Sequence, residues 1–177
     1  RMQQNTTIID VPNNSEISRH LHGAYFFDCY EMPVEFGSKS ALEIYLDVVA
    51  KTPQWVNTLM TIRNRAVTLV GLKDLGRLSD IKPSKSAGDY KVGDRIGIFS
   101  LLFLSDKEII LGDSDKHLEA RVSVCKLAEG AHHSVAVSTV VQIHNMLGRV
   151  YLFFVVPAHK IIVPAMLMRV ASNARSA

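Results

Sequence analysis

The sequence predicts an α+β protein in which a curved antiparallel β-sheet wraps around a long C-terminal helix, with two shorter helices after the first strand. Three observations predict this fold: an aromatic segment at 24–34, helical periodicity between 40 and 71, and alternating patterns from 95 to 143 that give way to a long apolar segment. A period of two indicates a strand and a period near 3.6 indicates a helix, so the patterns also give the order of the elements.

The first strand and the first helix are separated by a change of period. The segment 24–34 is rich in aromatic residues and ends with Pro33 and Val34, which is typical of a strand that a proline terminates. Ser40 and Glu43 have the spacing of a capping box, in which each side chain binds the backbone N–H of the other residue. We therefore expect a helix of about three turns to begin there.

A second helix is predicted to start at Thr52 and Pro53, because threonine caps helices and proline suits the first helical position. Gly71 is a suitable stop, since glycine readily adopts the left-handed conformation that ends many helices. The apolar residues between these limits recur at helical spacing: Trp55, Leu59, Ile62, Ala66 and Leu69.

Strands dominate the second half of the chain. The segment 73–93 is loop-like, and either an ordinary surface excursion or a lid over a cavity fits its composition. The segments 95–104 and 108–112 flank a hairpin turn, and two further strands follow. The long helix is expected after Gly148, with one stripe packed on the sheet: Tyr151, Phe154, Val155, Ala158, Ile162 and Ala165.

Composition limits the class of protein. A chain of 177 residues fits one domain at 24–172, with an extended lead-in at 1–23 and a short tail at 173–177. The apolar content of 47% excludes extensive disorder, and a net charge of +3 without a basic, aromatic stripe argues against nucleic acid as a partner.

Cys29 and Cys125 lack metal-ligand spacing, so we expect free buried thiols, with a disulfide as the alternative. No signal-peptide pattern is visible, which favours the cytoplasm. The segment 150–170 is the most membrane-like, but His159, Lys160 and two prolines interrupt it, so we expect a buried amphipathic helix and no membrane span.

The segment 112–126 is the most informative one for function, because it alternates an apolar face with an unusually polar one. A two-residue turn at Gly130 and Ala131 would pair it with the following strand, setting Leu118 opposite Ile143 and Glu119 opposite Gln142. The same register sets His117 opposite His144, whereas a slip of two residues would instead set His144 beside Glu119.

Several kinds of chemistry fit this polar strand face. A histidine beside a carboxylate suits acid–base catalysis, with His117, His144, Asp115 and Glu119 as candidates. Two imidazoles with Asp113 or Asp115 would suit a divalent metal, but this is the weakest alternative and no metal is expected. A solvated outer sheet face is the simplest interpretation.

Arg63 is the other isolated polar candidate. It falls on the same face of the second helix as Met60, Val67 and Val70, so it could reach into the protein, where a guanidinium needs an anionic partner. An ordinary polar stripe is the simpler alternative. The chain has no glycine-rich phosphate loop, nucleophile elbow, Cys-x-x-Cys or His-Glu-x-x-His motif, so no cofactor is expected.

Long segments of the chain resemble DUF2867, a bacterial family of unknown function. They are SALEIYLDVVAKTPQWVNTLMTIRNRAVTLVGLKDLG, YKVGDRIGIFSLLFLSDKEIILGDSDKHLEARVSV and STVVQIHNMLGRVYLFFVVPAHKIIVPAML, and the resemblance runs from about 24 to 169. It implies a helix-grip fold, similar to the START and Bet v 1 proteins, in which sheet and helix enclose an apolar cavity.

The resemblance implies no catalytic residues. Some relatives carry the domain behind an NAD(P)-binding domain that this chain lacks, so no nicotinamide cofactor is carried over. The resembling segments contain further polar residues that merit testing, without assigned roles: Asp113, Asp115, His117, His144, Asn145 and Arg149.

Three functional hypotheses follow. The first is a protein that binds a small hydrophobic molecule between sheet and C-terminal helix. The second is a protein-interaction or homodimerisation module, and the third is an enzyme of cyclase or hydrolase type, which we favour least. For the first hypothesis the expected ligand contacts are Trp55, Phe99, Phe103, Tyr151, Phe154 and Arg63.

Overall fold

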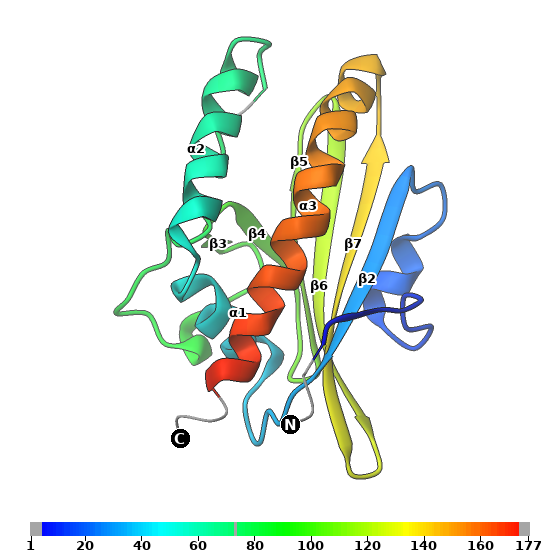
Figure 1. Ribbon diagram of the computed structural model, residues 1–177, viewed down its shortest axis with the longest axis vertical. Helices are drawn as coiled ribbons and strands as arrows, with labels where there is room; N and C mark the ends of the chain where they lie inside the picture. The colour runs from blue at the N-terminus through cyan, green and yellow to red at the C-terminus, as the bar shows by residue number, and fades with distance from the viewer. Residues whose placement is uncertain (1–4, 73, 174–177) are drawn as a thin grey trace.

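The computed structural model describes residues 5–72 and 74–173 of the chain, with side chains to residue 170. Its described strands form one antiparallel sheet in the order β1-β2-β7-β6-β5-β4-β3 (Figure 1). The strands are β1 Thr7–Ile8, β2 Phe26–Pro33, β3 Arg95–Ile96, β4 Phe99–Leu104, β5 Glu108–Ser114, β6 Leu118–Glu129 and β7 His132–Ile143. The helices are α1 Ala41–Ala50, α2 Gln54–Thr68 and α3 Met146–Asn173, with short 3-10 helices η1 Glu16–His20 and η2 Ala87–Asp89. The α+β class, the open antiparallel sheet and the long C-terminal helix are as predicted.

The limits of the two shorter helices follow from local hydrogen bonds. The Ser40 hydroxyl accepts from the Glu43 N–H at 3.2 Å, and the Glu43 carboxylate accepts from the Ser40 N–H at 2.7 Å, so the predicted capping box is confirmed. At the end of α2, Gly71 has φ +78°, and the Leu72 N–H donates to the Val67 carbonyl at 2.9 Å, which confirms the glycine stop.

The predicted cap of α2 is wrong by one residue. Pro53 occupies the cap position, and the Thr52 hydroxyl donates to the Val49 carbonyl of the preceding helix at 2.6 Å. Threonine therefore closes α1 here, because its hydroxyl is within reach of the last carbonyls of the turn before it.

The β6–β7 hairpin has the predicted register. Leu118 pairs with Ile143, Glu119 with Gln142, and the turn contains Gly130 at φ +59°. Alternation along β6 then sends Val124 into the core beneath the helices and leaves the odd-numbered residues on the opposite face. The predicted polar strand face is therefore the outer face of the sheet.

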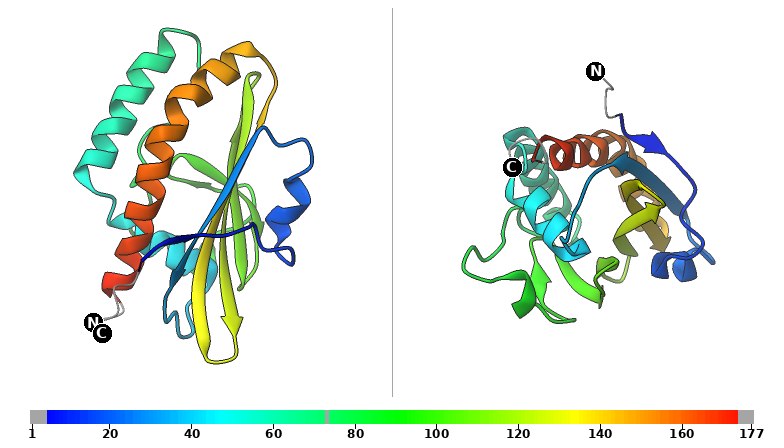
Figure 2. Two further views of the ribbon diagram at one scale, coloured as in Figure 1. Left: turned by 45° about the vertical axis from the view of Figure 1, so that its right-hand side comes forward. Right: turned by 90° about the horizontal axis from the view of Figure 1, so that it is seen from below.

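The two faces of the sheet are covered differently. The inner face packs against α1 and α3 and contributes to the larger core, whereas η1 and the chain before it cross the outer face, where Ile17 is fully buried (Figure 2). Glu108 fixes η1 there: its carboxylate accepts from the backbone N–H groups of Glu16 at 2.6 Å and Ile17 at 3.1 Å, and from the Ser123 hydroxyl at 2.7 Å.

The segment after α2 is anchored to the protein. Tyr90 is 5% exposed and belongs to the larger core, against which Leu78, Ile81 and Ala87 also pack. An ion pair between Lys85 and Asp94 at 2.6 Å closes the end of the segment. The described part of 73–93 is thus irregular, as predicted, but held by apolar side chains; residue 73 lies outside the described residues.

The C-terminal helix starts at Met146, so Gly148 lies in its first turn and not before it. The expected sheet-facing stripe is partly wrong, because Phe154 is 71% exposed and the buried residues are Leu152, Met166 and Leu167. A helix that is apolar on every side gives no periodic signal for its buried side, which explains the shifted assignment.

Candidate functional site

His117 and His144 lie just beyond the last pair of the β6–β7 hairpin, where β7 enters α3, and their imidazoles have different surroundings. His117 is 8% exposed, and its backbone N–H donates to Asp115 Oδ1 at 2.6 Å. The Leu118 N–H donates to the same oxygen at 3.0 Å, so Asp115 closes the turn before β6. His144 is exposed, and it meets His117 only through the backbone, donating its N–H to the His117 carbonyl at 2.9 Å.

Asn145 connects the His117 side chain to the start of α3. Its Oδ1 accepts from the Gly148 N–H at 3.1 Å, which caps the helix, and its Nδ2 donates to the Lys116 carbonyl at 3.2 Å. The same Nδ2 lies 2.9 Å from His117 Nδ1, which accepts in this arrangement. His117 Nε2 is buried, and no residue that the structure describes hydrogen bonds to it. The geometry gives His117 a tethering role at this junction.

The remaining catalytic candidate lies apart from this junction. Glu119 is on the outer sheet face, where it forms an ion pair with Arg121. Within 5–72 and 74–173, no three His, Cys, Asp or Glu side chains gather as metal ligands. The nearest concavity is an open one of about 510 Å³ lined by His144, Tyr25, Arg149 and their neighbours, with the Arg149 guanidinium 5.6 Å from the centre of the Tyr25 ring.

The six expected ligand contacts do not line one cavity. Phe99 packs against the inner core, whereas Phe103 packs in the outer cluster beneath η1. Trp55 and Phe154 are exposed on α2 and α3. Arg63 and Tyr151 are hydrogen-bonded to each other.

Arg63 and Tyr151 join the two helices. Arg63 Nε donates to the Tyr151 hydroxyl at 3.0 Å, and its guanidinium carbon lies 5.3 Å from the centre of the same ring. A second bond, from Nη1 to Asn64 Oδ1 at 2.9 Å, holds the guanidinium, and Asn64 is itself buried and donates to the Gly76 carbonyl at 2.9 Å. Arg63 therefore does reach into the protein, and its position is fixed.

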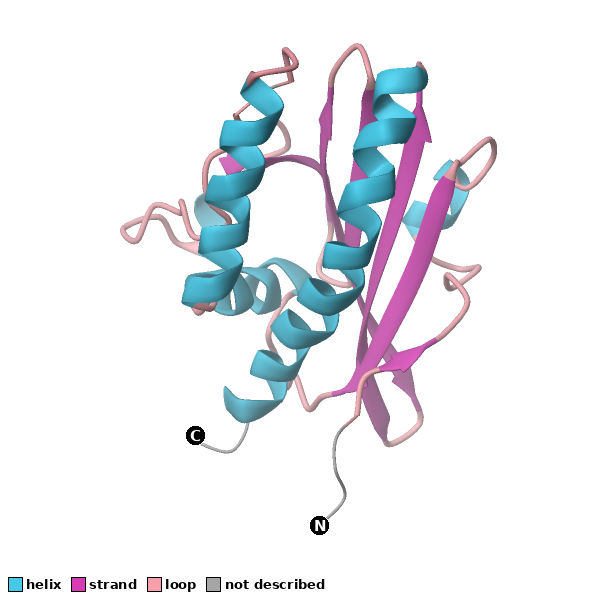
Figure 3. Cartoon of the chain, turned by 45° about the horizontal axis from the view of Figure 1, so that its top comes forward, coloured by secondary structure: helices cyan, strands magenta, loops and turns pink. Residues whose placement is uncertain are grey.

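Exposed apolar side chains lie along both helices that this pair connects. In α2 the buried residues Val56 and Val67 lie on a different side of the helix from the exposed apolar ones, and in α3 the buried Leu152 lies opposite the exposed Phe154 and Ile161. Because α2 and α3 stand on one side of the sheet and turn their buried sides inward, their exposed sides share one surface (Figures 1 and 3). We call it the helical apolar face: Trp55, Leu59, Ile62, Leu69, Val150, Phe154, Ile161 and Met168.

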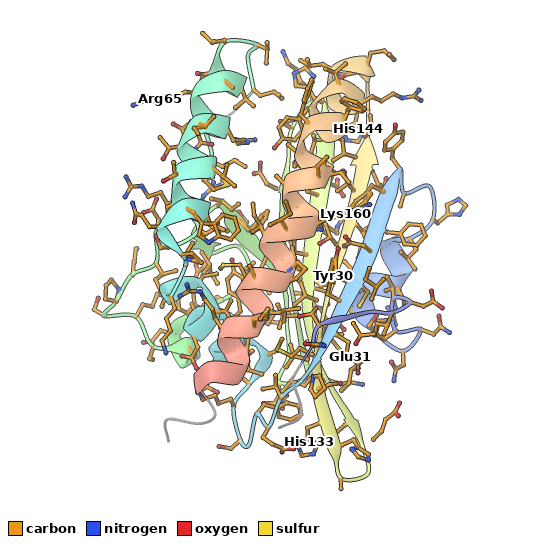
Figure 4. All side chains as sticks on the ribbon, viewed as in Figure 1. Tyr30, Glu31, Arg65, His133, His144 and Lys160 are labelled. Carbon is orange, nitrogen blue, oxygen red and sulfur yellow. The ribbon has the colours of Figure 1, made fainter. Side chains whose placement is uncertain are left out.

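The two helices that carry the helical apolar face have charged residues of one sign only. Residues 54–68 and 146–173 contain arginine, lysine and histidine but no aspartate or glutamate. Arg65 and Lys160 are both exposed: Arg65 lies at the outer edge of α2, and Lys160 lies midway along α3, near the middle of the molecule (Figure 4).

A partly buried contact between His159 and Asp28, which the sequence patterns did not predict, joins α3 to β2. His159 Nε2 lies 3.0 Å from Asp28 Oδ2, with 17% and 13% of the two side chains exposed, and Phe26 meets the imidazole edge-on at 5.7 Å. The neighbouring Thr139 hydroxyl is buried and has no hydrogen-bond partner among the described groups. The sequence did contain a signal for this contact: Asp28 interrupts the apolar segment of β2, and His159 interrupts that of α3.

Much of the surface of α3 is exposed to solvent. In the described chain, one segment, Met146–Val170, is long and apolar enough to cross a membrane by length and composition, and 17% of its most apolar stretch is buried. The expectation of a buried helix is therefore corrected: one side packs on the sheet and the other is open.

The protein is therefore of the α+β class, with one open antiparallel sheet and a long C-terminal helix that packs on the sheet along one side only. The family described as "Protein of unknown function (DUF2867)" matches residues 20–166, and the chain belongs to this family. No curated protein matches the chain. The crystal structure of CalU16 from Micromonospora echinospora is similar at 9% identity, over 97% of this chain and 92% of that one, with a TM-score of 0.30, a likeness too weak to carry an argument.

Proposed function

We propose that this chain has a helix-grip fold and binds a small, largely apolar molecule with an acidic group, held between α2 and α3. One observation carries the proposal: a fixed arginine–tyrosine pair, Arg63 with Tyr151, bridges two helices whose exposed side chains are otherwise mostly apolar. A binding site for an amphiphile needs this combination of apolar walls and a few placed polar groups.

The chemistry of Arg63 favours an acid over a neutral ligand. A guanidinium presents several N–H donors in a plane and binds carboxylates or phosphates in pairs of hydrogen bonds. The bonds to Tyr151 and Asn64 hold it in place before a ligand arrives, which lowers the entropic cost of binding. The apolar part of the ligand would lie on Trp55 and Phe154, where covering exposed surface contributes about 25 cal/mol per Å².

Trp55 makes this proposal testable without a label, because it is the only tryptophan of the chain. The experiment is a fluorescence titration with dodecanoate below its micelle concentration, with dodecanol as the uncharged control. We expect saturable quenching or a blue shift with dodecanoate, and weaker binding of dodecanol.

The matched variants are Arg63→Gln and Arg65→Gln, which remove the same charge from one helix. Arg63→Gln should weaken dodecanoate binding at least about tenfold and leave dodecanol unaffected, since a charge-assisted pair contributes roughly 1.5–3 kcal/mol. Arg65→Gln, whose side chain is exposed, should change neither. No response to either ligand, or equal losses in both variants, would refute the proposal.

A further inference from the structure

We infer that the helical apolar face docks onto the surface of a bilayer that contains anionic lipid, with α2 and α3 lying in the plane of the interface. This inference does not require the small ligand proposed above. It concerns what covers two helices that the rest of the chain leaves open.

The size of the face is the first argument. Phe154 is 71% exposed, Ile161 64% and Ile62 59%, and Phe153, on the same helix, is 75% exposed. A 28-residue helix extends over about 42 Å, so these side chains form a long apolar strip and not a single spot. Contiguous apolar surface of this extent marks a site of interaction with a protein, a ligand or a membrane.

The charge of the face selects among these occupants. Neither α2 nor α3 carries an acidic residue, whereas both carry exposed basic ones, Arg65 on α2 and Lys160 on α3. Exposed apolar and aromatic side chains together with basic residues on the same helices are the composition of helices that lie in the headgroup region of anionic membranes. In a symmetric pair of copies, the same face would meet itself and bring like charges together, which disfavours a second copy.

The attachment of α3 excludes a spanning orientation in this fold. Its buried side is packed on the sheet at Leu152 and Met166, and the His159–Asp28 pair ties its middle to β2. Lys160, next to this tie, is exposed and would sit in the middle of a spanning segment. The helix can therefore present its outer side to a bilayer while its inner side stays on the sheet.

The test is co-sedimentation of the protein with vesicles of phosphatidylglycerol and, in parallel, of phosphatidylcholine, with Trp55 fluorescence as a second readout. We expect binding to phosphatidylglycerol that weakens as salt is raised, a blue shift of Trp55, and much weaker binding to phosphatidylcholine.

The matched variants replace two exposed phenylalanines on opposite sides of the molecule. Phe154→Glu, on the helical apolar face, should lower the partition into phosphatidylglycerol vesicles at least about tenfold. Phe27→Glu, on β2 and 56% exposed on the outer side of the sheet, should leave it unchanged. Both positions are exposed, so both variants should fold, which circular dichroism checks.

Three results would overturn the inference. They are no binding to phosphatidylglycerol at low salt, equal losses for Phe154→Glu and Phe27→Glu, or a dimer in light scattering that Phe154→Glu converts to a monomer. The last result would make a second copy the occupant of the face. Failure here leaves the dodecanoate titration, done without vesicles, as an independent test of the small-molecule proposal.

Discussion

Replacing Gly148 with alanine should destabilise the protein, although the position is helical and alanine is the better helix former. A Cβ atom at Gly148 would lie 2.4 Å from the His117 carbonyl oxygen and 3.1 Å from Cγ2 of Ile143. The carbonyl is backbone and already accepts the His144 N–H at 2.9 Å, so it cannot move without loosening the join between β7 and α3. Helix propensity would contribute about 1 kcal/mol in favour of alanine, and overpacking costs about 1–3 kcal/mol. Because the contact is with fixed backbone, we expect the upper part of that range and a net loss of about 1–2 kcal/mol.

The measurement is thermal and urea unfolding followed by circular dichroism. For a chain of this length the expected loss lowers Tm by about 2–8 °C. Gly88→Ala is the matched control, because no heavy atom lies within 4 Å of the Cβ it would add, and we expect a change within about 0.5 kcal/mol. A Gly148→Ala protein as stable as the parent would show that His117 and the start of α3 are not in close contact.

Three further predictions concern buried or partly buried side chains that contact the sheet. Glu108→Gln should lower the free energy of unfolding by roughly 1–3 kcal/mol in urea titrations, because one carboxylate oxygen that accepts N–H groups of η1 becomes a donor. His159→Ala should lower the free energy of unfolding by about 1–3 kcal/mol, because it leaves the Asp28 carboxylate without its imidazole partner. Adding Asp28→Asn should restore part of that loss, whereas single-variant losses that simply add in the double variant would show that the two side chains do not interact. Burial raises the pKa of Cys29 and Cys125 from 9.0 to about 11, so the unfolded chain releases these protons first and stability should fall as pH rises from about 9 to 11; a double alanine variant should reduce that slope.

The elements that short-range chemistry specifies could be predicted from the sequence. Alternation along β6 and β7 excludes a slip of one residue, which would invert both faces, and the two-residue turn at Gly130 then distinguishes the observed register from a slip of two residues. The capping box at Ser40 and the glycine stop at Gly71 depend on residues within one turn of each other. The two cysteines, predicted as free thiols, are both buried and form no disulfide.

The features that long-range contacts specify could not be predicted in this way. The Asp28–His159 pair joins residues 131 positions apart, and no local pattern encodes that distance. The burial of His117 depends on Asn145, which lies across the hairpin. The apolar spacing of α2 correctly indicated a helix, but the burial of this stripe, which such spacing usually signals, does not follow: Ile62 and its neighbours face outward.

The outermost strands of the sheet, β1 and β3, are only two residues long. A sheet normally recruits further strands through the row of unpaired backbone N–H and C=O groups along its edge, and a two-residue edge offers very few of them. β1 and β3 themselves therefore offer little template for strand-by-strand growth, the first step toward fibrils. The exposed apolar surface that could drive association lies instead in the helical apolar face, whose side chains can be replaced one at a time. Solubility should therefore respond more to mutations in α2 and α3 than to changes in β1 or β3.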